Sequence, residues 1–409
     1  GTLLAIVGLF VAIILFEGGL TLKFSELKQA GAPVLRLCSL GVAFSFVLAS
    51  ISAAWIFDWN WRVAALLGAI LVVTGPTVVG PLLRVIKPTR KISSIVKWEG
   101  IVVDPIGAIL AVLVFQVALA GELQSAGGAV ALALLKTLLV GIVLAILLAK
   151  IIEFLLKRHY IPDFLESVFL LAVVAVAFAV SNAVQKESGL LTVTVLGIAL
   201  ANQKSVSVRN ILEFKENLRV LIISLLFILL SGRIAPTDLS NIALPSLAFL
   251  GALVLLVRPV SVYLSCLGSG NIDNRERSFL AALAPRGIVA AAVTSVFAIE
   301  FNHAAHQGKI DAAIAQQAEE MVPVVFLIII GTVFIYGLIA RPFAFHLGLA
   351  SRNADGILFA GADIWARRIA SALHNDGHSV MLLDTRYGNV AAARMDGLHA
   401  IRANILSEH

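Results

Sequence analysis

The sequence predicts an all-α polytopic membrane protein that is followed by a small α/β segment at its C-terminal end. Of the 409 residues, 59% are hydrophobic and 14% are charged, and the mean hydropathy is +0.97. A soluble domain is about half apolar and about a quarter charged. A membrane-spanning helix needs about 20 apolar residues. Eleven apolar segments approach or exceed this length, near residues 2–20, 31–57, 61–83, 92–119, 126–152, 165–186, 188–203, 211–232, 241–268, 278–301 and 321–340.

The loops between these segments alternate in charge, and this alternation predicts the orientation. Cytoplasmic loops are rich in Lys and Arg. Counting spans from the most basic loop places the other basic clusters on the same side, and the C-terminal segment with them. The net charge of +6 is thereby explained without a nucleic-acid partner. The reference loop contains Arg84, Lys87, Arg90 and Lys91.

Asp104 lies near the middle of the apolar stretch 92–119. A charge at this depth costs at least about 2.5 kcal/mol, so an intramembrane carboxylate predicts a functional site. Pro105 has no N–H, which leaves the carbonyl of Ile101 without its helical partner. Glycines one turn before and after Asp104 leave its face uncovered. A carboxylate, a free carbonyl and open space suit a small cation or a proton; the alternative is an acid that a buried Arg or Lys neutralises for structure alone.

Two apolar segments are interrupted by helix-breaking residues. Such breaks survive at membrane depth only where the loosened backbone is buried or lines a cavity. Paired breaks in the two halves of a transporter point to its binding site. Ordinary proline kinks are the alternative. The breakers are Gly75 and Pro76 after Thr74, which would free the carbonyl of Val72, and Pro285 and Gly287 around Arg286, which would free that of Ala281.

Six stretches of residues 1–342 carry a family resemblance, in the family's order. The chain resembles the CPA1-type monovalent cation/proton antiporters, in their NhaP-like sodium/proton exchanger branch. The stretches are FEGGLTLKFSEL (16–27), TGPTVVGPLLR (74–84), WEGIVVDP (98–105), ESGLLTVTVLGIALAN (187–202), FKENLRVLIISLLFILLSG (214–232) and PRGIVAAAV (285–293).

The resemblance implies a sodium/proton antiporter fold of thirteen helices, with inverted repeats and two discontinuous helices. One bundle forms a homodimer interface, and a mobile core bundle carries the ion. Gly1 opens inside an apolar run. Eleven spans against thirteen then imply that two N-terminal helices precede the sequence, and that residues 1–342 form the transmembrane domain.

The resemblance also implies roles for individual residues. Asp104 corresponds to the essential carboxylate that binds a cation and a proton in turn. Glu99 and Arg286 correspond to a buried structural ion pair. No metal ion other than a monovalent cation is expected. The two cysteines, Cys38 and Cys266, lie within apolar segments, form no metal motif or disulfide framework, and are expected to pack.

Three potential oxygen ligands of the family are missing from this chain. The family Asp between Thr and Pro is Gly75, the Asn before the essential Asp is Val103, and a small hydroxyl residue is Gly100. Asp104, Thr74, backbone carbonyls and water would have to complete the cation shell. The departures therefore bear on ion selectivity more than on exchange.

The C-terminal part has the pattern of half a doubly wound nucleotide-binding domain. After a linker at 343–355, residues 356–409 read as strand, tight Gly361 turn, helix and second strand ending at Asp384. An Ala-rich helical run and a third strand near 399–402 follow. This part resembles the RCK (TrkA-N) regulatory unit that often follows such antiporters.

The nucleotide fingerprint of this unit is degraded. Where the motif G-x-G-x-x-G is expected, residues 360–365 read AGADIW. The glycines normally let a pyrophosphate approach the backbone, and an acid such as Asp384 holds a ribose. NAD(H) or an adenine nucleotide is a candidate ligand at Gly361 and Asp384. A Rossmann unit without nucleotide is the alternative, and the membrane domain requires no cofactor.

These observations predict a secondary antiporter that exchanges Na⁺ or K⁺ for protons by alternating access. One carboxylate implies one proton against one monovalent ion, which is electroneutral. The expected setting is a homodimer in the lipid of a bacterial inner membrane. A ligand-gated cation channel and a non-transporting sensor on the same fold are the alternatives. An enzyme is not expected, because the chain has no evident nucleophile–base set.

Overall fold

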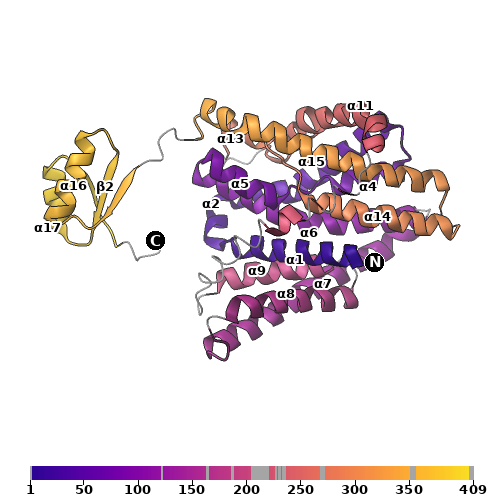
Figure 1. Cartoon of the computed structure of the whole chain (residues 1–409), viewed down its shortest axis with the longest axis horizontal. Helices are drawn as coiled ribbons and strands as arrows, with labels where there is room; N and C mark the ends of the chain where they lie inside the picture. Colours follow the sequence, from indigo (N-terminus) through magenta and orange to yellow (C-terminus); the bar gives the residue numbers. More distant parts are fainter. Residues whose placement is uncertain are drawn as a thin grey trace. The chain divides into compact units, whose positions relative to one another are not determined.

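The computed structural model describes residues 2–120, 123–162, 165–185, 188–203, 221–225, 228, 232, 236–267, 272–308, 310–350 and 356–404. The chain divides into two compact units, Gly1–Ala350 and Ser351–His409. In the first unit, long helices run roughly side by side, as the spans of one bundle do (Figure 1).

The first half of this unit extends from α1 to the end of α6, and the helices α7, α8 and α9 follow it. The elements are α1 (Thr2–Leu20), α2 (Phe24–Arg36), the π-helix η1 (Leu37–Gly41), α3 (Val42–Phe57), α4 (Trp61–Ile70), α5 (Pro76–Ile86), α6 (Arg90–Ala120), α7 (Leu123–Lys157), α8 (Glu166–Val184) and α9 (Ser188–Asn202).

The second half repeats the pattern of the first. Its elements are α11 (Pro236–Ala252), the π-helix η3 (Leu253–Val257), α12 (Arg258–Ser265), α13 (Asn274–Ala281), α14 (Ile288–His306) and α15 (Ala312–His346).

The order of a π-bulged helix, a broken helix and a continuous helix occurs in both halves. It runs from α2 to α6 and again from α11 to α15. A π-bulge is rare and often marks a functional site. Its appearance at corresponding places supports the predicted internal repeat, although neither bulge was predicted from the sequence.

The helices match the predicted spans closely. By length and composition, seven of the described helices can cross a membrane, and three shorter apolar helices accompany them. The predicted breaks separate α4 from α5 and α13 from α14, so the two discontinuous helices are confirmed. The predicted span at 211–232 lies mostly outside the described residues.

The first unit extends beyond the boundary that was predicted at residue 342. Helix α15 continues through Pro342 to His346. The Thr89 N–H then donates to the Leu349 carbonyl at 2.9 Å, and Pro88 and Ala350 form an isolated antiparallel bridge. The segment predicted as a linker therefore begins inside the first unit. Proline removes one helical hydrogen bond, but a membrane helix tolerates it where other groups satisfy the backbone.

Close packing of α1 on α9 depends on two glycines. A Cβ on Gly19 would collide with the Thr194 carbonyl oxygen, and one on Gly197 would collide with the Phe16 carbonyl oxygen. Small residues let membrane helices approach in this way. Helices α1 and α9 are therefore closely packed on each other, and both contact α6.

The second unit has the predicted β-α-β-α-β order. It contains β1 (Ile357–Ala360), α16 (Ile364–Asn375), β2 (Val380–Asp384), α17 (Tyr387–Met395) and β3 (His399–Arg402), and its parallel sheet has the order β1-β2-β3. Gly361 turns the chain between β1 and α16 with φ +115°, a value that favours glycine.

Candidate functional site

The two helix breaks cross each other in the first unit. The Gly75 N–H donates to the Pro285 carbonyl at 3.1 Å. A Cβ on Gly75 would overlap the Cα of Gly287, so the two backbones touch at a point that admits no side chain. Pro76 then starts α5 in the first turn, where its missing N–H costs nothing. The four predicted helix breakers therefore meet at one crossing.

Asp104 lies on α6 beside the first break. A Cβ on Gly107 would overlap the Val73 side chain, and Val103 shares a small buried cluster with Val72. Positions 103, 104 and 107 lie on neighbouring parts of the helix surface because residues three and four apart are adjacent. The unwound segment after α4 therefore packs against the side of α6 that carries Asp104.

Asp104 and Thr74 are buried polar groups whose hydrogen-bonding capacity is unused. Asp104 is 0% exposed and Thr74 is 4% exposed. Neither carboxylate oxygen of Asp104, nor the Thr74 Oγ1, has a hydrogen-bond partner among the described residues. Buried polar atoms are nearly always satisfied, so such a group calls for an explanation. Oxygen atoms of this kind are ligands for a hard cation, and the carboxylate can alternatively take a proton.

Arg286 bonds to the backbone at the crossing. Its Nη1 donates to the carbonyls of Val72 and Val73, at 3.0 and 3.1 Å, and its backbone N–H donates to the Thr332 Oγ1 at 3.2 Å. These carbonyls follow the C-terminal end of α4, where a cation is favourable. The carbonyl of Val72, which the sequence predicted to be free, is therefore occupied.

The predicted ion pair between Glu99 and Arg286 is wrong, because Glu99 pairs with Arg258. The Arg258 Nη1 and Nη2 donate to the Glu99 Oε1 and Oε2 at 2.5 and 2.9 Å, and its Nε donates to the Leu280 carbonyl at 3.1 Å. Both side chains are buried. Five residues turn an α-helix by about 140°, so Glu99 leaves α6 on a different side from Asp104.

Sequence reasoning missed the role of Arg258. The signal was present, because Arg258 lies inside the predicted span 241–268. An arginine at this depth in the membrane is as costly as a carboxylate, so its position alone marks Arg258 as it marks Asp104. In the structure Arg258 is the first residue of α12, directly after η3.

In the second unit Asp384 is held by its own chain. Its Oδ2 accepts hydrogen bonds from the Ala362 N–H and the Asn389 Nδ2, and its Oδ1 accepts one from the Arg386 N–H, all at 2.8 Å. The Arg386 N–H and the other two donors lower the pKa of the Asp384 carboxyl to about 2. Asp363, just before α16, accepts from the same Asn389 amide at 3.0 Å.

This arrangement is a poor match for a dinucleotide. A pyrophosphate needs free N–H groups and positive potential at the N-terminus of the first helix. The Ala362 N–H is already occupied, and the Asp363 carboxylate lies where the phosphate charge would be. Gly361 provides the tight turn without the accompanying glycines.

Multivalent metal binding has no candidate cluster in the described part of the chain, where no three His, Cys, Asp or Glu side chains gather in a possible metal site. Cys38 and Cys266 are both free cysteines.

Relatives of known name match the chain over most of its length. The K(+)/H(+) antiporter NhaP2 of Shewanella sp. (strain ANA-3) is 27% identical over 281 residues, which cover 69% of this chain and 49% of that protein. The Na(+)/H(+) antiporter 1 of Methanocaldococcus jannaschii is 27% identical over 300 residues, which cover 70% of this chain and 69% of that protein. The chain spans about half the length of the first of these relatives.

Solved structures share the fold. The sodium proton antiporter MjNhaP1 from M. jannaschii at pH 8 aligns with a TM-score of 0.69 and 20% identity, over 84% of this chain and 91% of that chain. An electron microscopy map of the same antiporter gives a TM-score of 0.71 and 22% identity, over 83% of each chain. The family model described as the transmembrane sodium/hydrogen exchanger matches residues 2–346. The chain therefore belongs to the sodium/hydrogen exchanger family.

Proposed function

We propose that this protein exchanges a monovalent cation, Na⁺ or K⁺, for a proton across the membrane, with Asp104 as the carrier of both. The observation that carries the proposal is the Asp104 carboxylate, which is fully buried with both oxygens unbonded among the described residues. A charge at this depth needs a counter-charge, and a proton or a cation supplies it equally well. Competition between the two for one carboxylate is the chemical basis of exchange.

The crossing of the broken helices supports alternating access. Backbone ends at a crossing provide polar groups at membrane depth without lining a continuous pore. Arg286 compensates the end of α4 in this chain, so the crossing remains stable without the acid that Gly75 replaces. With one carboxylate in the site, the simplest cycle moves one proton against one cation and is electroneutral.

The ligand set bears on which cation is carried. Thr74 Oγ1 and Asp104 provide side-chain oxygens, whereas Gly75, Val103 and Gly100 provide none. Water and backbone carbonyls would complete the shell. A partly hydrated site discriminates weakly between Na⁺ and K⁺, and relatives named for each cation fit this expectation.

Flux measurements in proteoliposomes test the proposal. A pH-sensitive dye reports proton movement after Na⁺, K⁺ or Li⁺ is added on one side, and the membrane potential is clamped. An exchanger shows saturable proton movement that requires the cation and persists at zero potential. Cation current without proton coupling would instead indicate a channel, and no movement with any cation would favour a non-transporting sensor.

The second unit is proposed to regulate exchange, as an RCK-like module on the cytoplasmic side. Its fold has the β-α-β-α-β order of such modules, and its chain leaves the first unit at the bridge between Ala350 and Pro88, close to the start of α6. Because Asp384 and Ala362 already bond to each other, NAD(H) or an adenine nucleotide should bind weakly or not at all.

The proposed setting is a homodimer in the bacterial inner membrane. Between Leu132 and Phe154, α7 exposes many Leu, Ile and Val side chains, which suits lipid or a second subunit. Crosslinking in native membranes would distinguish the two.

A further inference from the structure

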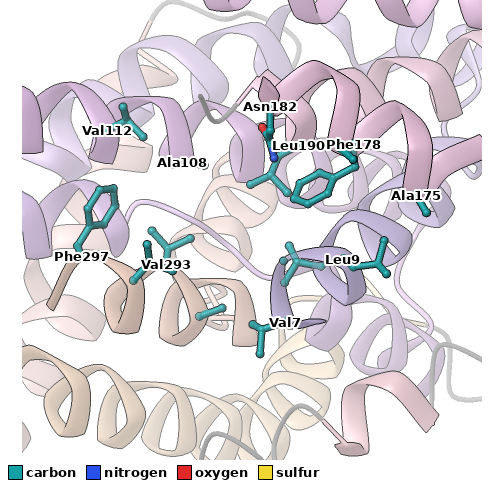
Figure 2. A pocket seen from close by; sticks show the side chains of 15 residues that line it. Val7, Leu9, Ala108, Val112, Ala175, Phe178, Asn182, Leu190, Val293 and Phe297 are labelled. Carbon is teal, nitrogen blue, oxygen red and sulfur yellow. The ribbon is translucent and has the colours of Figure 1, made fainter. Parts of the chain in front are cut away.

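A cavity of about 570 Å³ lies between α6 and α14 on one side and α1, α8 and α9 on the other. Figure 2 shows the two groups of side chains that face each other across it. Both groups are mainly apolar. The first includes Val112, Val293 and Phe297, and the second includes Val7, Phe178 and Leu190.

Among the described residues that line the cavity, Asn182 of α8 is the one polar side chain. Its Oδ1 accepts a hydrogen bond from the Gly189 N–H at 2.8 Å, and this bond fixes the orientation of the amide. Gly189 is needed for the contact because a Cβ there would collide with Asn182 and Phe178. The Nδ2 has no partner among the described residues, so two N–H donors remain available at the cavity (Figure 2).

The polar and apolar ends of the cavity differ in depth. Asn182 lies two residues before the end of α8, and Leu190 lies near the start of α9, so both are at the end of the bundle. Ala108 and Val112 line the deeper part, and they follow Asp104 by one and two helical turns on α6. The cavity therefore runs from a hydrogen-bond donor near the membrane surface to hydrocarbon near the midplane.

We propose that this cavity binds one single-chain amphiphile, with its head at Asn182 and its hydrocarbon chain between the two helix groups. The head must accept a hydrogen bond, as a carboxylate, ester or hydroxyl does. None of the described lining residues is Asp or Glu, so they offer no counter-charge to a cationic head. The volume lies within the roughly 300–1,000 Å³ that small-ligand sites occupy, and apolar walls with one oriented polar group are typical of such sites.

Photo-crosslinking of the whole protein tests this site. The protein is placed in phosphatidylcholine nanodiscs, because residual detergent is itself a single-chain amphiphile. The probe is dodecanoic acid with a diazirine near the end of its chain, and crosslinked peptides are identified by mass spectrometry. We expect labelling of α8 or α14 that laurate displaces and dodecyltrimethylammonium does not. Transport is not the readout, since fatty acids carry protons across membranes by themselves.

Three variants separate a site from general membrane partitioning. Ala179→Trp fills the cavity from an exposed lining position and should reduce labelling about tenfold, whereas Val176→Trp, exposed on the same helix outside the lining, should not. Asn182→Asp keeps the acceptor for Gly189 but removes the donors and adds a negative charge, so it should weaken laurate competition by more than the roughly fivefold loss that one hydrogen bond represents. Thermal melting confirms that each variant is folded. Equal labelling of Ala179→Trp and Val176→Trp, or equal competition by the cationic amphiphile, would overturn the proposal.

Discussion

Glu99 and Asp104 lie on the same helix, and both are buried, but their surroundings differ completely. Glu99 receives two hydrogen bonds from Arg258. Asp104 receives none from the described residues. A buried charge is tolerated when a fixed partner neutralises it. Glu99 is therefore a structural group with a fixed partner, whereas we infer that Asp104 obtains its partner from outside the protein.

The two buried arginines, Arg258 and Arg286, also differ in their partners. Arg258 donates hydrogen bonds to Glu99 and to the Leu280 carbonyl, and these bonds connect α6 to α12 and to the end of α13. Arg286 donates hydrogen bonds to the carbonyls of Val72 and Val73, which follow the end of α4. Since neither guanidinium bonds to Asp104, the chain fixes the charges around the site and leaves the site carboxylate itself free.

Replacing Asp104 should have the largest effect on exchange. Asp104→Asn removes the proton site and the anionic ligand together, so cation-dependent proton flux in proteoliposomes should fall to the level of empty liposomes. The melting temperature should not fall, because no protein partner loses its charge. Substantial exchange by this variant would remove Asp104 from the mechanism.

Breaking the Glu99–Arg258 pair should have the largest effect on stability. Removing one partner of a buried pair leaves an uncompensated charge and costs about 3–5 kcal/mol. Glu99→Gln and Arg258→Met should each lower the melting temperature, and the double variant should be more stable than the sum of the two losses predicts. Strict additivity in this double-mutant cycle would show that the two residues act independently.

Gly75→Ala tests the crossing of the two breaks. The added Cβ would overlap the Cα of Gly287, and overpacking of this kind costs about 1–3 kcal/mol. Thermal stability and exchange should both decrease. Gly337→Ala is the matched control, because a Cβ there meets nothing within 4 Å. Restoring the family acid by Gly75→Asp should fail for the same steric reason, and a fully active Gly75→Asp protein would contradict the close contact.

Thr74 should tune cation affinity without being essential. Thr74→Val removes the unbonded Oγ1 while keeping the shape of the side chain, and Thr74→Ser keeps the hydroxyl. One lost interaction of about 1 kcal/mol corresponds to roughly a fivefold rise in the half-saturating cation concentration. Equal values for the Val and Ser variants would mean that the hydroxyl is not a ligand.

The smallest effect should come from the second unit, whose carboxylate at Asp384 is satisfied by its own chain. Its folded pKa of about 2 lies below the usual value of 3.8, so its stabilising contribution is complete above the usual value and is lost as the pH falls through about 2. Asp384→Asn should increase hydrogen exchange at the Ala362 amide at pH 7, and the difference should vanish near pH 2. Exchange of cations should be unaffected by this change; a loss of transport would make the second unit part of the core machinery.

Patterns along the chain were sufficient to predict the features that depend on local chemistry. The depth of a charged residue within an apolar stretch identified Asp104. Glycine and proline residues located both helix breaks, and apolar runs located β1, β2 and β3. Each of these follows from residues within a few positions of one another.

Pairings between distant segments could not be predicted in the same way. The partner of Glu99 depends on how α6 and α12 are rotated, and two buried arginines were equally eligible by charge. The occupied carbonyl of Val72 depends on Arg286, which lies far along the chain. The π-bulges η1 and η3 have no residue signature in this chain, because they reflect packing between helices rather than local preference.

The most direct test of the account is proton release from the purified protein when a cation is added. In weakly buffered nanodiscs, adding Na⁺ or K⁺ should release protons from the wild type, with a midpoint that rises as the pH falls. Glu99→Gln should retain the release, because Glu99 is not the exchanging group. Asp104→Asn should release none. Proton release of wild-type size from Asp104→Asn would contradict the claim that this carboxylate binds the cation and the proton in turn.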